Sequence, residues 1–356
     1  MTTHPGALPD WARAHGAPLF AAGIRSRPCD FVVDEQLAIE FSGEGEHDYL
    51  HVQKTGANTQ WVARRLARHA DVALVDVGFS GLKDRHAETR QWFSVRRKPG
   101  ASDPWSTLDI EGVRILELQR HRRKLRRGAH KSNAFRIALR AKEPVRKHDE
   151  IAERLRQIES FGVPNYFGEQ RFGFEGGNLD LARRCFKGDR LSRDKRSIAI
   201  SAARSFIFNE ILAARVAGKS WNRICRGDVA NLDGSASIFT VTEVDDKLQQ
   251  RCDEMDIHPT GSLWGKDAPL VSHDIAELER TVASRFPELI EGLQSVSMDA
   301  SSRALRLPVR DLRWEIDPDA LWLEFRLPRG GYATAVLREI ASVEDMSWRR
   351  QAGQVR

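Results

Sequence analysis

The stretch from residue 72 to residue 95, VALVDVGFSGLKDRHAETRQWFSV, places a charged loop between two apolar runs. The first run, residues 72–77, and the last, residues 92–95, have the composition of short strands. Glycines bracket the loop, and Asp84 lies within it among several cations. A strand followed by such a loop is a common means of presenting side chains to a ligand. The stretch therefore predicts a sheet-based fold with a functional loop.

Strand-like sequence continues on both sides of this stretch through the first 140 residues. Further strands are predicted by four β-type runs, at residues 30–35, 49–53, 113–118 and 135–139. One helix is expected between them, because Asn58 and Thr59 offer N-cap oxygens before an apolar helical pattern that reaches Leu66.

The middle of the chain is richer in helices. Helical spacing of apolar residues occurs at residues 151–158, 179–186, 198–216 and 275–293, with a glycine- and aromatic-rich loop at residues 162–177 and one strand at residues 237–241. Strands return at residues 303–307, 313–316 and 322–327. We expect these last strands to complete the N-terminal sheet, so that the middle forms an inserted domain.

Composition narrows the class of protein. With 356 residues, the chain is long enough for two domains. Its 41% hydrophobic and 30% charged residues exclude a disordered, collagen-like or coiled-coil protein. No apolar run approaches the roughly 18 to 20 residues of a membrane helix, and residues 1–11 show no secretion signal, so a cytoplasmic protein is expected. Four cysteines without a Cys-x-x-Cys pair predict reduced thiols.

Charge clustering is more informative than the net charge of +6, which is too small to identify a nucleic-acid-binding protein. Residues 120–131 contain seven basic residues and no acid. Such a run resists close packing unless a polyanion or water meets it, so a phosphate backbone is a natural partner. A solvated loop is the alternative interpretation.

Asp84 is the candidate reactive carboxylate. Lys83 and Arg85 flank it, and adjacent cations favour the ionised form that a nucleophile or general base requires. A solvated charged turn would show the same pattern. The loop at residues 162–173 mixes aromatic rings, amides and Arg171, which suits either nucleotide stacking or the filling of a domain junction.

His47 and His51 have the spacing of a zinc-protease helix, but Asp48 stands where the catalytic glutamate should be. The neighbouring glycines and the alternation around Leu50 favour a strand instead. Since no third ligand is apparent, we expect two ordinary histidines and no metal.

Taken together, these segments resemble the TruD family of tRNA pseudouridine synthases over about residues 23–339. The motifs that carry the resemblance are Arg25 with residues 30–35, residues 81–84 with Thr89 and Gln91, residues 124–128 with Asn133 and Phe135, residues 165–168 with 170–173, and residues 327–334. Ser132 replaces a glycine of the family's Gly-Asn-x-Phe motif, and Tyr332 stands where the family typically has phenylalanine.

The resemblance implies roles for particular residues. Asp84 would be the essential carboxylate, which either adds to C1' of the nucleotide or removes a proton from C2'. Arg25 would pair with Asp84, and Phe31, Asn133 and Tyr332 would hold the flipped base. The full set of implied substrate-binding residues is Arg25, Phe31, Lys83, Asn133, Phe135 and Tyr332, and that of implied phosphate contacts is Arg122, Arg123, Lys124, Arg126 and Arg127.

The same resemblance implies an α/β (α+β) fold. A catalytic domain with a mixed, mostly antiparallel sheet would comprise residues 1–161 and 299–356, and an α/β domain would be inserted at residues 162–298, with RNA in the cleft between them. The implied reaction isomerises uridine to pseudouridine, at position 13 of certain tRNAs. We therefore expect tRNA as partner, a monomer, and no cofactor, metal or membrane.

Two other functions remain open at this point. The basic run alone would suit an RNA-binding protein without catalytic activity. A metal-dependent hydrolase built on His47 and His51 is a more distant alternative. Activity on uridine-containing tRNA after exhaustive chelation would separate all three.

Overall fold

The computed structural model describes residues 8–97, 104–143 and 145–347, so the expectation about a secretion signal falls partly outside the described residues. The chain divides into two compact units. One, here called the sheet unit, comprises residues 18–152, 309–330 and 341–356. The other, the helical unit, comprises residues 1–17, 153–308 and 331–340, and so contains the whole of the expected insertion at residues 162–298.

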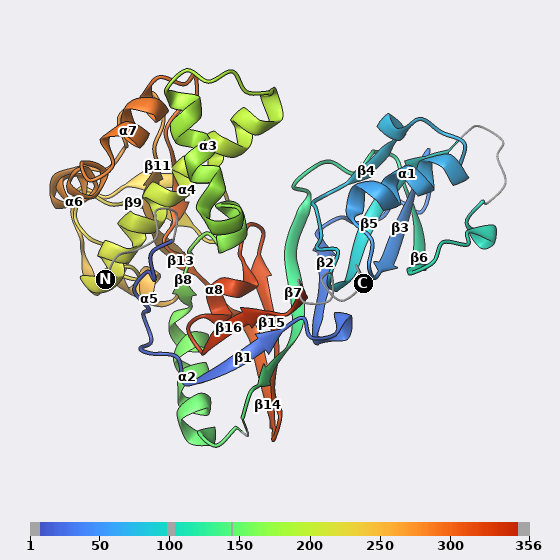
Figure 1. Ribbon diagram of the computed structural model, residues 1–356, viewed down its shortest axis with the longest axis horizontal. Helices are drawn as coiled ribbons and strands as arrows, with labels where there is room; N and C mark the ends of the chain where they lie inside the picture. The colour runs from blue at the N-terminus through green and yellow to red at the C-terminus, as the bar shows by residue number, and fades with distance from the viewer. Residues whose placement is uncertain (1–7, 98–103, 144, 348–356) are drawn as a thin grey trace. The chain divides into compact units, whose positions relative to one another are not determined.

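The sheet unit is built on a ten-stranded sheet (Figure 1). Its main path runs in the order β14-β15-β7-β2-β5-β3-β6, and β1, β16 and β4 join at its sides. Most pairs are antiparallel, whereas β2 with β5 and β1 with β16 are parallel. The strands are β1 (Phe20–Ile24), β2 (Phe31–Leu37), β3 (His47–Lys54), β4 (Val77–Phe79), β5 (Glu88–Arg96), β6 (Val113–His121), β7 (His130–Ala141), β14 (Arg310–Asp317), β15 (Ala320–Pro328) and β16 (Ala341–Asp345). The predicted mixed sheet, formed by both ends of the chain, is confirmed.

Helix α1 (Thr59–His69) covers one face of this sheet. It begins as predicted, since the Asn58 side chain accepts a hydrogen bond from the backbone N–H of Trp61 at 2.8 Å. Val62 and Leu66 pack with Phe93 of β5, and all three are wholly buried. Each such side chain stabilises the unit by about 1.5–3 kcal/mol relative to leaving it exposed.

The helical unit has its core around α4 (Arg193–Ala217), whose buried side chains include Phe206, Ile207, Phe208 and Leu212. By length and mean hydropathy α4 could cross a membrane, but 67% of its apolar window is buried inside the unit. It is therefore the central helix of a packed core. The other helices are α2 (His148–Phe161), which spans the division between the units, α3 (Gly177–Phe186), α5 (Asp246–Asp253), α6 (His273–Ala283), α7 (Pro287–Gln294) and α8 (Ala333–Leu337).

A four-stranded sheet in the order β10-β9-β11-β12 completes the helical unit, together with the two-stranded pair of β8 and β13. The strands of both are β8 (Val163–Pro164), β9 (Val229–Leu232), β10 (Ile238–Thr240), β11 (Ile257–Leu263), β12 (Ser301–Ala304) and β13 (Arg306–Leu307). The unit thus combines helices and strands, as the resemblance implied.

Three expectations about the fold were wrong. Residues 303–307 do not join the large sheet, because β12 pairs with β11 and β13 pairs with β8 in the helical unit. Residues 72–77 form a short 3-10 helix, Leu74–Asp76, and β4 begins only at Val77. Leu74 and Val75 are exposed, so their apolar character does not indicate a buried strand. The expected helix over residues 275–293 is two helices, because Pro287 lacks the N–H that a continuous helix needs and instead begins α7.

Candidate active site

The loop at residues 80–87 connects β4 to β5 and is anchored by side chains from several elements. The Ser80 hydroxyl lies 2.6 Å from Nδ1 of His130 in β7. Burial lowers the pKa of His130 to about 4, so its neutral ring can accept this hydrogen bond. Further along, the N–H of Lys83 donates to the Thr59 hydroxyl at 2.9 Å, and that hydroxyl donates to Gln91 at 2.8 Å. The loop therefore has a defined path over the sheet.

Asp84 holds its carboxylate in this loop through two contacts. Oδ2 lies 3.0 Å from Nη2 of Arg25, and Oδ1 accepts a hydrogen bond from the backbone N–H of His86 at 2.9 Å. The side chain keeps 28% of its surface exposed, so one side of the carboxylate is open to a ligand. A carboxylate that is fixed and yet accessible suits nucleophilic or general-base chemistry.

Arg25 is itself fixed from three directions. Its guanidinium pairs with Asp345 as well as with Asp84, and it lies over the ring of Phe31 at 4.3 Å from the ring centre. The residue is buried, and its backbone adopts φ of 56°, a left-handed conformation that is unfavourable for a residue other than glycine. Strain of this kind persists only where the surroundings enforce it, and it is concentrated at functional sites.

The family model of tRNA pseudouridine synthase D (TruD) matches residues 15–189 and 188–340 of the chain. The chain belongs to the TruD family. Curated relatives named tRNA pseudouridine synthase D include one from Methylococcus capsulatus, which is 46% identical over 353 residues that cover 98% of this chain and 99% of the relative. Another, from Pseudomonas aeruginosa, is 46% identical and covers 92% of each chain.

A solved structure supports the fold independently. The crystal structure of a protein from Methanosarcina mazei, described as a candidate TruD, has a TM-score of 0.70 and covers 96% of this chain and 98% of its own. At 19% sequence identity, this likeness concerns the fold.

Lys83, in the same loop as Asp84, does not project freely into solvent. Its Nζ lies 2.5 Å from Oε2 of Glu35 in β2, and both side chains are buried. Glu35 also accepts a hydrogen bond from the N–H of Trp92 at 3.3 Å. Breaking a buried ion pair by removing one partner typically costs about 3–5 kcal/mol, so this pair ties the loop firmly to the sheet.

Three other residues implied by the resemblance lie on the same face of the sheet. Phe31 is buried beneath Arg25 and meets the Phe135 ring edge-on, with ring centres 6.3 Å apart. Asn133 faces Glu35 across the strand pair of β7 and β2. Its buried Oδ1 has no hydrogen-bond partner among the described residues. A buried acceptor left unpaired costs about 1–3 kcal/mol, so a partner from a ligand would stabilise it.

Tyr332 belongs to the helical unit, whereas Asp84 belongs to the sheet unit. It lies just before α8, and its hydroxyl accepts a hydrogen bond from Nη2 of Arg171 at 2.7 Å. Its ring centre lies 6.1 Å from that of Phe167. Arg171 and Phe167 lie in the segment at residues 165–173, so two of the segments that carry the resemblance meet at Tyr332.

The basic run at residues 120–131 is less uniformly available than its sequence suggests. Arg122 pairs with Glu44, Lys124 donates to a backbone carbonyl, and Arg127 lies over an aromatic ring at 3.8 Å from its centre. Arg123 and Arg126 are exposed, and neither side chain has an ion-pair partner in the described part of the chain. Among the five implied phosphate contacts, these two are the most free to meet a phosphate.

His47 and His51 lie in β3, as the alternation around them predicted. His51 stacks on Trp92 with ring centres 4.7 Å apart, and its Nε2 lies 3.2 Å from Asp34. Within residues 8–97, 104–143 and 145–347, no group of three histidines, cysteines or carboxylates could hold a metal ion. All four cysteines are free thiols.

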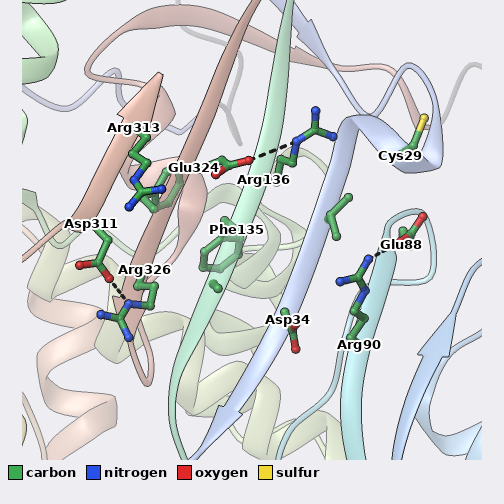
Figure 2. A pocket seen from close by; sticks show the side chains of 13 residues that line it. Cys29, Asp34, Glu88, Arg90, Phe135, Arg136, Asp311, Arg313, Glu324 and Arg326 are labelled. Atoms are coloured by element: carbon green, nitrogen blue, oxygen red, sulfur yellow. Dashed lines mark hydrogen bonds and ion pairs between the residues drawn. The ribbon is translucent and has the colours of Figure 1, made fainter. Parts of the chain in front are cut away.

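A pocket of about 430 Å³ opens on the other face of the large sheet (Figure 2). Asp34 and Arg136 line it. Because side chains alternate along a strand, Glu35 and its cross-strand partner Asn133 point to the opposite face, where Glu35 contacts Lys83 of the Asp84 loop. Its charges are largely paired with each other, as Figure 2 shows for Arg136 with Glu324 at 3.3 Å. Phe135, one of the implied site residues, also lines this pocket, whereas Asp84 does not.

Sequence reasoning missed Asp345 and the anchoring role of Thr59. Asp345 reaches the site because β16 pairs in parallel with β1, which sets it opposite Ile24. Neither strand was predicted, and no motif includes Asp345. Thr59 was recognised only as a possible helix cap, a common position for threonine.

Proposed function

We propose that this chain is an isomerase that converts uridine to pseudouridine in tRNA, with Asp84 as its essential carboxylate. The observation that carries the proposal is the fixed, partly exposed Asp84 carboxylate, held by Arg25 and the N–H of His86 in a chain of the TruD family. The curated relatives carry the same activity in their name.

The reaction breaks the bond between C1' and N1 of uracil, turns the base, and joins C1' to C5. The proton on C5 is lost and N1 gains one, so atoms balance without net oxidation or hydrolysis. For that reason the reaction needs no cofactor. Asp84 serves either by adding to C1' or by removing a proton from C2', and a carboxylate is required on both routes.

A base in a folded tRNA arm must leave its stack before C1' can be reached. We propose that Asn133 then accepts a hydrogen bond from an N–H of the extruded uracil, because its Oδ1 is buried and unpaired within the described residues. Phe31 supports Arg25 from below, and Phe135 supports Phe31. Tyr332 supplies the ring on which the base stacks. Arg122, Arg123, Lys124, Arg126 and Arg127 form the phosphate-binding surface.

Finer assignments follow from the resemblance. We propose uridine 13 in the D arm as the target, the cytoplasm as the place of action, and a monomer as the active form. A tRNA in which cytidine replaces uridine 13 would then gain no pseudouridine. Sedimentation of the protein alone would test the monomer.

The deciding experiment is Asp84→Asn, which keeps shape and polarity but removes the charge. Mass-tagging of pseudouridine in tRNA should show no product, while filter binding shows retained tRNA affinity. Asp76→Asn, at the exposed 3-10 helix before β4, is the matched control and should keep its activity. If Asp84→Asn turns over within about tenfold of the parent, the carboxylate is not essential. An RNA-binding protein without catalytic activity would give no product with the parent either.

A further inference from the structure

Lys54 is the last residue of β3 and is wholly buried. Its Nζ donates hydrogen bonds to three backbone carbonyls, those of Ala57 at 2.8 Å, Asp84 at 3.1 Å and Lys83 at 3.4 Å. Two of the three belong to the loop that carries the reactive carboxylate. An ammonium group has three hydrogens, and here each has an acceptor.

A lysine is almost never fully buried unless its charge is compensated. Burial lowers the pKa of Lys54 from 10.5 to about 8, the nearby charge of Lys83 acts in the same direction, and that of Asp84 acts in the opposite one. Lys83 and Asp84 are themselves paired with other charged residues, Lys83 with Glu35 and Asp84 with Arg25. Placing a charge here is costly, and an apolar side chain at the end of β3 would avoid the cost.

We propose that Lys54 is a positioning residue for the reaction, whose ammonium group fixes the backbone of residues 83 and 84 and thereby the direction of the Asp84 carboxylate. The inference rests on the proposed role of Asp84. Arg25 and the N–H of His86 hold the two carboxylate oxygens, and Lys54 holds the same residue at its main chain. Two such attachments fix an orientation that one alone leaves free to rotate.

Loss of the charge should therefore slow the chemical step. A displacement of about 1 Å at a reacting group can cost about a hundredfold in rate. Above its pKa, neutral Lys54 has two hydrogens and one lone pair facing three carbonyls, so at least one hydrogen bond must break. We expect the rate constant to fall as the pH rises through about 8.

The free energy of unfolding should rise, and not fall, as the pH increases above about 8. The pKa of Lys54 in the folded protein lies below its value of 10.5 in the unfolded chain, so the unfolded chain binds more protons between about pH 8 and pH 10. The contribution of Lys54 to the free energy of unfolding therefore rises with pH in this window. A merely structural lysine would not lower the rate while stability holds.

The test compares the parent with Lys54→Met, which keeps the length of the side chain and removes its hydrogen bonds. Lys142→Met is the matched control, since Lys142 is an exposed lysine of the same unit that pairs with Glu344 at 2.8 Å. Single-turnover formation of pseudouridine and tRNA affinity are measured between about pH 7 and 9.5, with the melting temperature at each pH.

We expect Lys54→Met to react about a hundredfold more slowly with nearly unchanged tRNA affinity, and to lose the decline in rate near pH 8 that the parent shows. A rate within about threefold of the parent would overturn the inference, while an inactive Asp84→Asn would leave the proposed function standing. If Asp84→Asn is active, both fall. If Lys54→Met fails to fold, the pH dependence of the parent tests the proposal. A parent rate that does not change between about pH 7 and 9.5 refutes the positioning role, and a rate that declines while the melting temperature is retained supports it.

Discussion

Replacing Tyr332 by phenylalanine removes a hydroxyl that receives a hydrogen bond from the Arg171 guanidinium at 2.7 Å. Hydrogen bonds that involve a charged group contribute about 1.5–3 kcal/mol to stability, and partial exposure of Tyr332 favours the lower end. For a unit of this size, 1 kcal/mol corresponds to about 2–4 °C in melting temperature, so Tyr332→Phe should lower it by about 3–6 °C. The ring remains, and the rate of the folded enzyme should be nearly unchanged.

Tyr332→Ala removes the ring as well. Stacking on an aromatic side chain is worth about 1–3 kcal/mol per base, so its loss should slow single-turnover pseudouridine formation about ten- to a hundredfold. Tyr166→Phe is a useful comparison, because the Tyr166 hydroxyl donates to an uncharged carbonyl, that of Ala12, at 2.9 Å in the same unit. Thermal melting and single-turnover rates are measured on all three variants.

Two results would refute this reasoning. If Tyr332→Phe melts within about 1 °C of the parent, the hydrogen bond from Arg171 contributes nothing to stability. If Tyr332→Ala is unstable but its folded fraction reacts at the parent's rate, the ring belongs to the core around Phe167 and another group holds the base.

Two further predictions concern charge. Replacing Arg123 and Arg126 by alanine should make tRNA affinity less dependent on salt. In filter binding, the log-log slope of affinity against salt concentration should decrease by about 0.7–0.9 for each phosphate that is no longer neutralised. Arg122→Ala alone should have less effect, because Arg122 already pairs with Glu44. Burial raises the pKa of Glu279 to about 7, above its value of 4.5 in the unfolded chain. The free energy of unfolding should therefore fall as the pH rises from about 4.5 to 7. Melting curves of Glu279→Gln should show a smaller fall over this range. An unchanged salt slope in the double arginine variant would contradict the first prediction, and a pH dependence of Glu279→Gln equal to that of the parent would contradict the second.

Local sequence signals predicted much of the sheet. The alternation of Phe135, Ile137 and Leu139 identified β7, since Ile137 and Leu139 are wholly buried on one face. Asn58, one of the two predicted caps, lies directly before the first residue of α1. Both depend on interactions within a few residues of chain, which sequence reasoning treats well.

Long-range features were harder to predict. Residues 72–77 look like a strand because they are apolar, but their burial is decided by neighbours distant in sequence. Lys54 carries no signal at all, because only the fold shows that three carbonyls surround its side chain. Asp84 was predicted from its flanking cations and motif, yet its contact with Arg25 links two loops that are far apart in the sequence.

The bridge from Arg25 to Asp345 joins residues 320 positions apart in the chain. During synthesis, β1 and the Asp84 loop leave the ribosome long before β16 exists to pair with β1 and to supply Asp345 (Figure 1). Pairings between such distant segments form slowly, and here they must wait for translation to supply the partner strands. A nascent chain therefore carries Asp84, the proposed reactive carboxylate, in an incomplete setting, and the protein should acquire activity only once β16 has been translated.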